Sequence, residues 1–129
     1  MADIGVLVID DHPSFRVAAR ALIDATPGFS EVAEAGTGQE GLNLAAEKLP
    51  DVALIDLDLP DMTGFETCDR MRELSPSTYV VFISANEDAA AAIPECCDMQ
   101  PFVAKRDLRP ALLRELWESR ASDQARPAG

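Results

Sequence analysis

A chain of 129 residues with 47% hydrophobic side chains has the length of one domain and enough apolar material for a single core. Its net charge of −12, from 23 acidic and 11 basic residues, excludes nucleic-acid binding through a general basic patch, because such a surface repels phosphate backbones. Two of the three cysteines, Cys96 and Cys97, are adjacent, so we expect reduced thiols rather than a disulfide framework. The apolar runs are too short for a signal peptide or a membrane span, and we expect a cytoplasmic protein that binds no membrane.

Five short β-like runs alternate with helical patterns along the chain. The runs are Gly5–Ile9, Glu31–Ala35, Val52–Ile55, Tyr79–Ile83 and Phe102–Ala104. Three of them are almost entirely apolar, which is typical of strands that are buried on both faces of a parallel sheet. Glu31–Ala35 has the weakest pattern and is predicted to be an edge strand.

Helical patterns fill the intervals between these runs. Pro13 suits a first helical turn, and Thr37 with Glu40 and Thr63 with Glu66 form capping boxes, in which the threonine caps the helix that follows. The apolar positions expected on the helices are Phe15, Ala19, Leu22 and Ile23; Leu42, Ala45, Ala46 and Leu49; Phe65, Cys68 and Met71; and, in the last helix, Leu108, Ala111, Leu112 and Leu116.

This alternation predicts βαβ units with right-handed crossovers, and hence an α/β domain whose parallel sheet has helices on both faces. We expect one domain over residues 1–121, followed by a flexible tail or the start of a linker over residues 122–129. In sheets of this kind, ligands bind beyond the carboxyl ends of the strands. The residues at those ends are therefore the candidates for function.

Charged and hydroxyl side chains follow four of the predicted strands. Asp10 and Asp11 follow the first strand, Asp56 the third, Ser84 the fourth and Lys105 the fifth. Carboxylates gathered closely would be destabilising without a counter-ion, and oxygen ligands suit a hard cation, above all Mg²⁺. A carboxylate beside Mg²⁺ and an ammonium can attack a phosphoryl group, since both cations neutralise charge on the transferring oxygens. The product would be an aspartyl phosphate.

These residues lie in motifs that resemble the signature of response regulator receiver domains. The motifs are VLVIDDHPSFR, IDLDLPDMTGFE, the serine after VVFI, and PFVAK, and the similarity covers residues 4–120. The first motif is most similar to the NarL/FixJ class, whose members usually append a helix-turn-helix DNA-binding domain. The resemblance implies a CheY-like, flavodoxin-like fold, namely a single doubly wound (βα)5 domain with a five-stranded parallel sheet of order 2-1-3-4-5.

The resemblance also implies a role for each acidic residue of the site. Asp56 would be the phosphoacceptor and a ligand of Mg²⁺. Asp11 would bind the ion directly, Asp10 largely through water, and Asp58 through its backbone carbonyl.

Ser84, Lys105 and Phe102 complete the implied mechanism. Ser84 and Lys105 would each bind a phosphoryl oxygen, and Phe102 would turn inward as Ser84 moves, which would change the face formed by the fourth helix, the fifth strand and the last helix. The implied donor is a sensor histidine kinase or acetyl phosphate, and a homodimer on phosphorylation is a further expectation. DNA would be bound only through an output domain outside this chain. The chain would be a signalling domain, not an enzyme, because it would catalyse only its own phosphorylation and slow dephosphorylation.

The segment between Ser84 and Lys105 departs from the family pattern. It is shorter by about one residue, and a proline and two adjacent cysteines stand where a regular helix and a Gly-Ala turn are usual. The fourth helix, Asn86–Ala92, is expected to be short or irregular and mobile, because Pro94 stops it after about two turns. We expect this change to affect the output face rather than the chemistry.

Other interpretations stay open at this point. A haloacid-dehalogenase-like phosphatase also has a DxD motif after a strand, here Asp56-Leu57-Asp58, although its second acidic pair should follow the lysine. A receiver used only for protein contacts and a stand-alone single-domain regulator are two further alternatives. Asp61 is interpreted as a turn or cap residue, and His12 as a structural or surface histidine, because nothing in the sequence pairs with it.

Overall fold

The structure is a computed structural model that describes residues 3–85 and 100–124, with side chains described as far as residue 120. The predicted fourth helix, Asn86–Ala92, and its expected irregularity and mobility lie outside the described residues. None of the described helices is long and apolar enough to cross a membrane.

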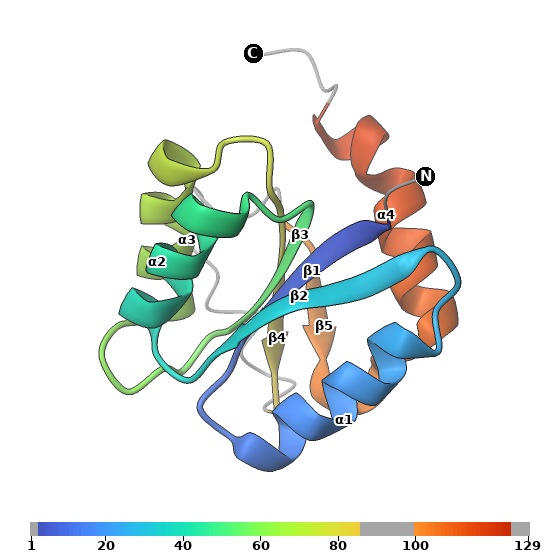
Figure 1. Ribbon diagram of the computed structural model, residues 1–129, viewed down its shortest axis with the longest axis horizontal. Coiled ribbons are helices and arrows are strands. Elements are labelled where there is room, and N and C mark those ends of the chain that lie inside the picture. Colours follow the sequence, from blue (N-terminus) through green and yellow to red (C-terminus); the bar gives the residue numbers. More distant parts are fainter. Residues whose placement is uncertain (1–2, 86–99, 125–129) are drawn as a thin grey trace.

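Five parallel strands form one sheet of order β2-β1-β3-β4-β5 (Figure 1), which confirms the predicted order. The strands are β1 (Ile4–Ile9), β2 (Phe29–Ala35), β3 (Val52–Asp56), β4 (Tyr79–Ser84) and β5 (Phe102–Ala104). β2 lies at one edge of the sheet, as its weaker apolar pattern predicted. The interior strands β1 and β3 are buried on both faces, which is why their sequences are almost continuously apolar.

Helices cover both faces of the sheet, so the doubly wound α/β architecture is also confirmed. One face carries α1 and α4, and the other carries α2 and α3 (Figure 1). Their bounds are α1 (Pro13–Asp24), α2 (Gly38–Lys48), α3 (Gly64–Leu74) and α4 (Pro110–Gln124), with a 3-10 turn at Lys105–Asp107 between β5 and α4.

Alternate residues of the central strands supply the two layers of the core. In β1, Val6 and Val8 pack in the layer under α1 and α4, whereas Leu7 and Ile9 pack in the layer under α2 and α3. Each fully buried aliphatic side chain of this kind stabilises the fold by about 1.5–3 kcal/mol. The two layers together hold the strands in fixed positions, and so they fix the edge where the strands end.

The threonine caps of both predicted capping boxes are present. The Thr37 side chain accepts the Glu40 amide at 3.1 Å at the start of α2, and the Thr63 side chain accepts the Glu66 amide at 3.1 Å at the start of α3. α2 ends one residue before Leu49, which was predicted on its apolar face but is an exposed C-cap in the left-handed region, with φ of 46°.

The predicted apolar face of the last helix is confirmed in part, because Leu112 and Leu116 are partly buried against the core layer under α1 and α4. Leu108 is buried but precedes α4, and Ala111 is exposed. The fully buried residue is instead Leu113, which packs in the layer that also holds the partly buried Leu116 and Trp117. The helix begins after Leu108, and a stripe counted from that residue includes Leu112 and Leu116 but not Leu113.

Candidate functional site

The carboxyl ends of the parallel strands lie at one edge of the sheet, and the predicted site residues are found there. Asp10 follows β1, Asp56 is the last residue of β3, Ser84 is the last residue of β4, and Lys105 follows β5. The loop between β1 and α1 adds Asp11. This is the edge at which open α/β sheets bind their ligands.

The loop between β1 and α1 is held by hydrogen bonds to Asp10. The Asp10 side chain is 0% exposed, and its Oδ1 accepts the backbone N–H of His12 at 2.7 Å. Arg16 donates from Nη1 to the Asp10 carbonyl oxygen at 2.6 Å. The Asp11 side chain remains 37% exposed. One acid of the pair is therefore buried and fixed, and the other borders the solvent.

Asp56 is buried at the end of β3, with a side chain that is 4% exposed. Its Oδ1 accepts the backbone N–H of Asp58 at 3.2 Å. α3 begins so close to this point that a Cβ on Gly64 would lie 2.5 Å from the Asp56 carbonyl oxygen, so glycine is required there. Burial raises the pKa of Asp56, and the Asp10 charge adds to the rise, against the opposing effect of its hydrogen bonds.

Lys105 is the cation that faces the two buried carboxylates. Its Nζ lies 2.6 Å from Asp10 Oδ2 and 3.1 Å from Asp56 Oδ2, and it lies 4.8 Å from the ring centroid of Phe15. Burial alone would lower the pKa of Lys105, but its ion pairs with Asp10 and Asp56 outweigh it and raise the pKa. The ammonium group is therefore charged throughout the physiological pH range.

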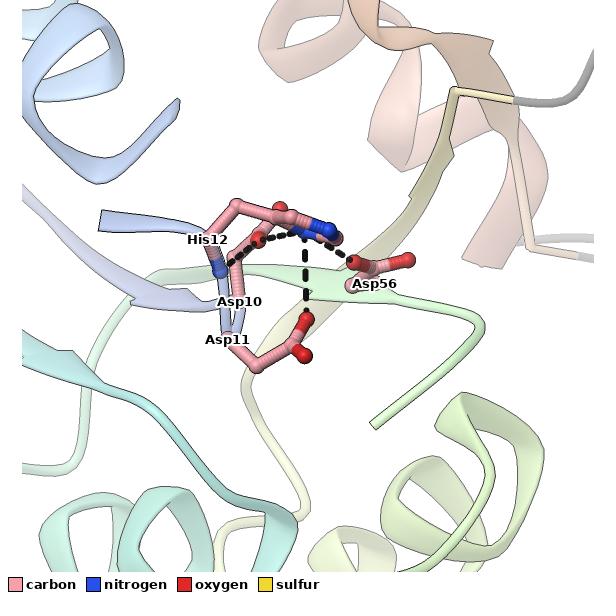
Figure 2. A group of neighbouring side chains, drawn as sticks. All are labelled: Asp10, Asp11, His12 and Asp56. Atoms are coloured by element: carbon pink, nitrogen blue, oxygen red, sulfur yellow. Dashed lines mark hydrogen bonds and ion pairs between the residues drawn. The ribbon is translucent and has the colours of Figure 1, made fainter. Parts of the chain in front are cut away.

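The structure brings His12 into the site, which the sequence analysis did not predict. Figure 2 shows its ring among three carboxylates, with Nδ1 3.0 Å from Asp10 Oδ1, 3.1 Å from Asp11 Oδ1 and 3.7 Å from Asp56 Oδ2. The ring is 60% exposed, so the expectation of a surface histidine describes its exposure but not its contacts. The available signal was its position directly after the acidic pair.

The cluster fits a divalent cation. Asp10, Asp11, His12 and Asp56 each offer one ligand atom, and these atoms all lie within 4.8 Å of one another. Asp10 Oδ2 is buried and accepts no well-aligned hydrogen bond from the described residues, although Lys105 is close enough for an ion pair. Three carboxylates beside one lysine leave an excess of negative charge, which a bound cation would neutralise.

The remaining predicted residues lie around this cluster. Ser84 is buried and is paired in register with Ala104, and Phe102 is paired with Phe82 and partly buried against the core layer under α2 and α3. Asp58 contacts the site through its amide. The switch roles of Ser84 and Phe102 and the metal-binding role of the Asp58 carbonyl stay predictions.

Comparison with known proteins gives the family. Residues 6–116 match the family model of the response regulator receiver domain. The chain therefore belongs to the response regulator receiver domain family, a class of signalling domains, as its motifs predicted.

Curated relatives are response regulators and transcription regulators. The chain is 37% identical over 122 residues to the nitrate/nitrite response regulator protein NarL of Escherichia coli K12, with 92% of this chain and 55% of that protein covered. It is 41% identical over 86 residues to the transcriptional regulatory protein LiaR of Bacillus subtilis 168, with 66% and 41% covered. The chain thus spans about half the length of the curated relatives it matches.

Solved receiver structures have the same fold. A LuxR-family two-component response regulator from Aurantimonas sp. SI85-9A1 superposes with a TM-score of 0.78 at 28% identity, covering 93% of this chain and 86% of that one. The response regulator domain of Thermotoga maritima CheB superposes with a TM-score of 0.77 at 27% identity, covering 97% and 99%.

Proposed function

We propose that this chain is a phosphoryl-accepting receiver, in which Asp56 takes a phosphoryl group from a sensor histidine kinase beside a bound Mg²⁺. The observation that carries the proposal is the convergence of Asp10, Asp11 and Asp56 within 4.8 Å at one edge of the sheet, with Lys105 paired to two of them. Family membership supports the kinase as the partner, because receiver domains generally act with one.

In the proposed transfer, a carboxylate oxygen of Asp56 forms a bond to phosphorus, and the donor leaves with the electron pair of the bond that breaks. The Asp58 amide holds Asp56 Oδ1 and so orients the nucleophile. Lys105, 3.1 Å from Asp56 Oδ2, would neutralise the charge that arrives with the phosphoryl oxygens. Mg²⁺ would add to this neutralisation, and its proposed ligands are Asp10, Asp11, Asp56 and the carbonyl of Asp58.

The phosphoryl group is proposed to act on a two-state face of the domain. Ser84 would move toward a phosphoryl oxygen, and Phe102 would turn into the space beside it. Ser84 and Phe102 lie on the adjacent strands β4 and β5. The Phe102 side chain is only partly buried, so it could exchange its present position for a more buried one. The face that includes β5 and α4 would carry the signal, since a local charge change can bias a bistable element.

The regulated process is proposed to be transcription. The relatives include proteins named as transcription regulators, and the chain spans about half their length. In a longer protein, residues 1–121 would be the receiver, 122–129 would begin a linker, and a following output domain would contact DNA. The net charge of −12 supports that division, because this acidic domain would repel DNA. A cytoplasmic location and a homodimer formed on phosphorylation belong to the same proposal.

Incubation with acetyl phosphate and Mg²⁺, followed by intact-protein mass spectrometry, tests the phosphoryl transfer. The wild type should gain the mass of one phosphoryl group, and a chelator should prevent the gain. Asp56→Asn should gain none, because an amide oxygen is a poor nucleophile. The matched control is Asp61→Asn, an acid-to-amide change in the same loop that should keep the label. Labelling of Asp56→Asn equal to that of the control would refute the assignment.

A further inference from the structure

His12 is the one nitrogen donor in the acidic cluster, and it is the single histidine of the chain. Its Nδ1 lies 3.0 Å from Asp10 Oδ1 and 3.1 Å from Asp11 Oδ1, and 3.3 Å from Lys105 Nζ. The ring is therefore in contact with both carboxylates of the acidic pair and with the ammonium group at the same nitrogen atom.

Neither neutral tautomer of His12 satisfies all of these contacts. With a hydrogen on Nδ1, the ring can donate to a carboxylate, but its N–H then faces the N–H groups of Lys105. Without that hydrogen, the ring accepts from Lys105, but its lone pair faces the oxygens of Asp10 and Asp11. A cation bound between Nδ1 and the carboxylates removes the second conflict, because the lone pair and the oxygens would all point at one positive charge.

Two of the three separations, those to Asp10 and Asp11, agree with ligands that share one ion, and the separation to Asp56 is longer. Two neighbouring ligands on an octahedral ion with bonds of about 2.1 Å lie about 3.0 Å apart, and on a tetrahedral ion with bonds of about 2.0 Å they lie about 3.3 Å apart. The distances of Nδ1 to Asp10, Asp11 and Asp56 are 3.0, 3.1 and 3.7 Å. We propose that His12 binds the cation through Nδ1 and makes this a mixed nitrogen and oxygen site, which prefers a first-row transition ion such as Zn²⁺ or Co²⁺ to Mg²⁺.

Ligand chemistry gives the direction of this preference. Mg²⁺ prefers oxygen ligands and holds its water strongly, whereas imidazole nitrogen suits zinc and the later first-row ions. Metal binding would require little rearrangement of the His12 backbone, because its N–H already donates to Asp10 Oδ1 at 2.7 Å. The inference rests on the proposed function, since it adds a ligand to the divalent-ion site at which the phosphorylation is proposed to occur.

Nitrogen NMR of untagged protein labelled with ¹⁵N-histidine tests the inference directly. Because the chain has a single histidine, the spectrum reports one ring, and zinc bound elsewhere does not produce the signal. Saturation with Zn²⁺ should shift the Nδ1 resonance to the position of a metal-bound nitrogen and leave Nε2 protonated. Saturation with Mg²⁺ serves as the control and should produce a smaller shift. Ring nitrogens that do not respond to Zn²⁺ would overturn the proposal.

Two variants measure the effect of the ring on affinity by calorimetry. His12→Ala removes the ring and keeps the backbone N–H that Asp10 accepts, so the loop is expected to hold its shape. Zn²⁺ and Co²⁺ affinity should fall by about tenfold or more, since loss of a ligand costs at least as much as loss of the groups that orient it. Mg²⁺ affinity should change far less. His12→Asn offers an oxygen ligand instead, and the ratio of Zn²⁺ to Mg²⁺ affinity should fall in both variants.

The outcomes separate this inference from the proposed function. If the wild type binds Mg²⁺ and is labelled at Asp56 while the affinity ratio is the same in His12→Ala, the role of His12 is wrong and the phosphoacceptor assignment stands. If the wild type binds neither ion and takes no label, both are wrong.

Discussion

Lys105 Nζ lies 2.6 Å from Asp10 Oδ2, and this ion pair joins a side chain that is 0% exposed to one that is 12% exposed. Removal of the ammonium would leave Asp10 and Asp56 buried without their cation. Lys105→Met should therefore lower the free energy of unfolding of the metal-free protein by about 3 kcal/mol, measured by urea denaturation in a chelator. The same variant should bind Mg²⁺ more tightly, since no ammonium competes for the carboxylates.

Arg106→Met is the matched control, because it removes the neighbouring positive charge from a side chain that is 69% exposed. Its effect on unfolding should stay within about 0.5 kcal/mol. Equal losses in the two variants would show that the pair between Lys105 and Asp10 does not stabilise the fold.

Glu31, in the edge strand β2, predicts a pH dependence of the stability. Its side chain in β2 is 11% exposed, and burial, together with a hydrogen bond to Glu34, raises its pKa to about 8 from 4.5. Between these values the folded state keeps a proton that the unfolded state has lost, so stability falls as the pH rises through this window and levels off above it. Glu31→Gln should gain stability over the wild type as the pH rises, with the largest gain at and above about pH 8.

Melting temperatures of Glu31→Gln and the wild type check this prediction. They are measured over roughly pH 5 to pH 9, a range that includes the pH values at which Glu31 differs in protonation between the folded and unfolded states. Glu47→Gln, at an exposed position on α2, should follow the wild-type curve. A constant difference between Glu31→Gln and the wild type across the range would contradict the account of burial.

Asp61 confirms the expectation of a cap, but it caps a helix from a different segment of the chain. Its carboxylate accepts the backbone N–H groups of Gly38 at 2.8 Å and Gln39 at 2.9 Å, at the start of α2. Asp61→Ala should lower the free energy of unfolding by about 1 kcal/mol. The hydrogen bond from Gln39 lowers the pKa of Asp61, so its contribution is present above the ordinary value of 3.8 and is lost as the pH falls through the lower folded value.

Chemical denaturation of the wild type and Asp61→Ala at several pH values tests this cap. The two stabilities should converge as the pH is taken below about 4. A gap that keeps its size at low pH would mean that the carboxylate charge takes no part in capping α2.

Leu49 offers a stabilising substitution. It is the one non-glycine residue with positive φ in the described part of the chain, at 46°, and it is exposed at the end of α2. A side chain in this region costs roughly 1 kcal/mol, which glycine avoids. Leu49→Gly should raise the free energy of unfolding by about 0.5 kcal/mol or more, and the melting temperature should rise with it. Leu49→Ala keeps a Cβ and should show no gain, so a similar rise in both would count against backbone strain as the cause.

The strands and their ends could be predicted because burial imposes a simple pattern. Runs such as Val52–Asp56 are apolar on both faces, and the first polar residue marks the end of the buried stretch. The caps at Thr37 and Thr63 are equally local, since a hydroxyl three residues before a glutamate satisfies nearby amides. Local rules of this kind were enough to bring Asp10 and Asp56 to the same edge of the sheet.

Features that depend on tertiary contacts were not predictable in the same way. The contacts of His12 exist because two strand ends and the 3-10 turn after β5 meet around its ring. The burial of Leu113, beside the predicted Leu112 and Leu116 of α4, depends on where the chain leaves the turn after β5. The burial of Glu31 arises from packing against α1, where Arg20 lies 3.7 Å away, and nothing in its own segment indicates it.

Mapping the phosphoryl group on the wild type tests the central claim most directly. Protein treated with acetyl phosphate and Mg²⁺ is reduced with borohydride, which converts an aspartyl phosphate to homoserine, and is then digested and sequenced by mass spectrometry. We expect homoserine at Asp56 and aspartate unchanged at Asp10, Asp11 and Asp58. Homoserine at any of those three positions with Asp56 unmodified would contradict the assignment of Asp56 as the phosphoacceptor.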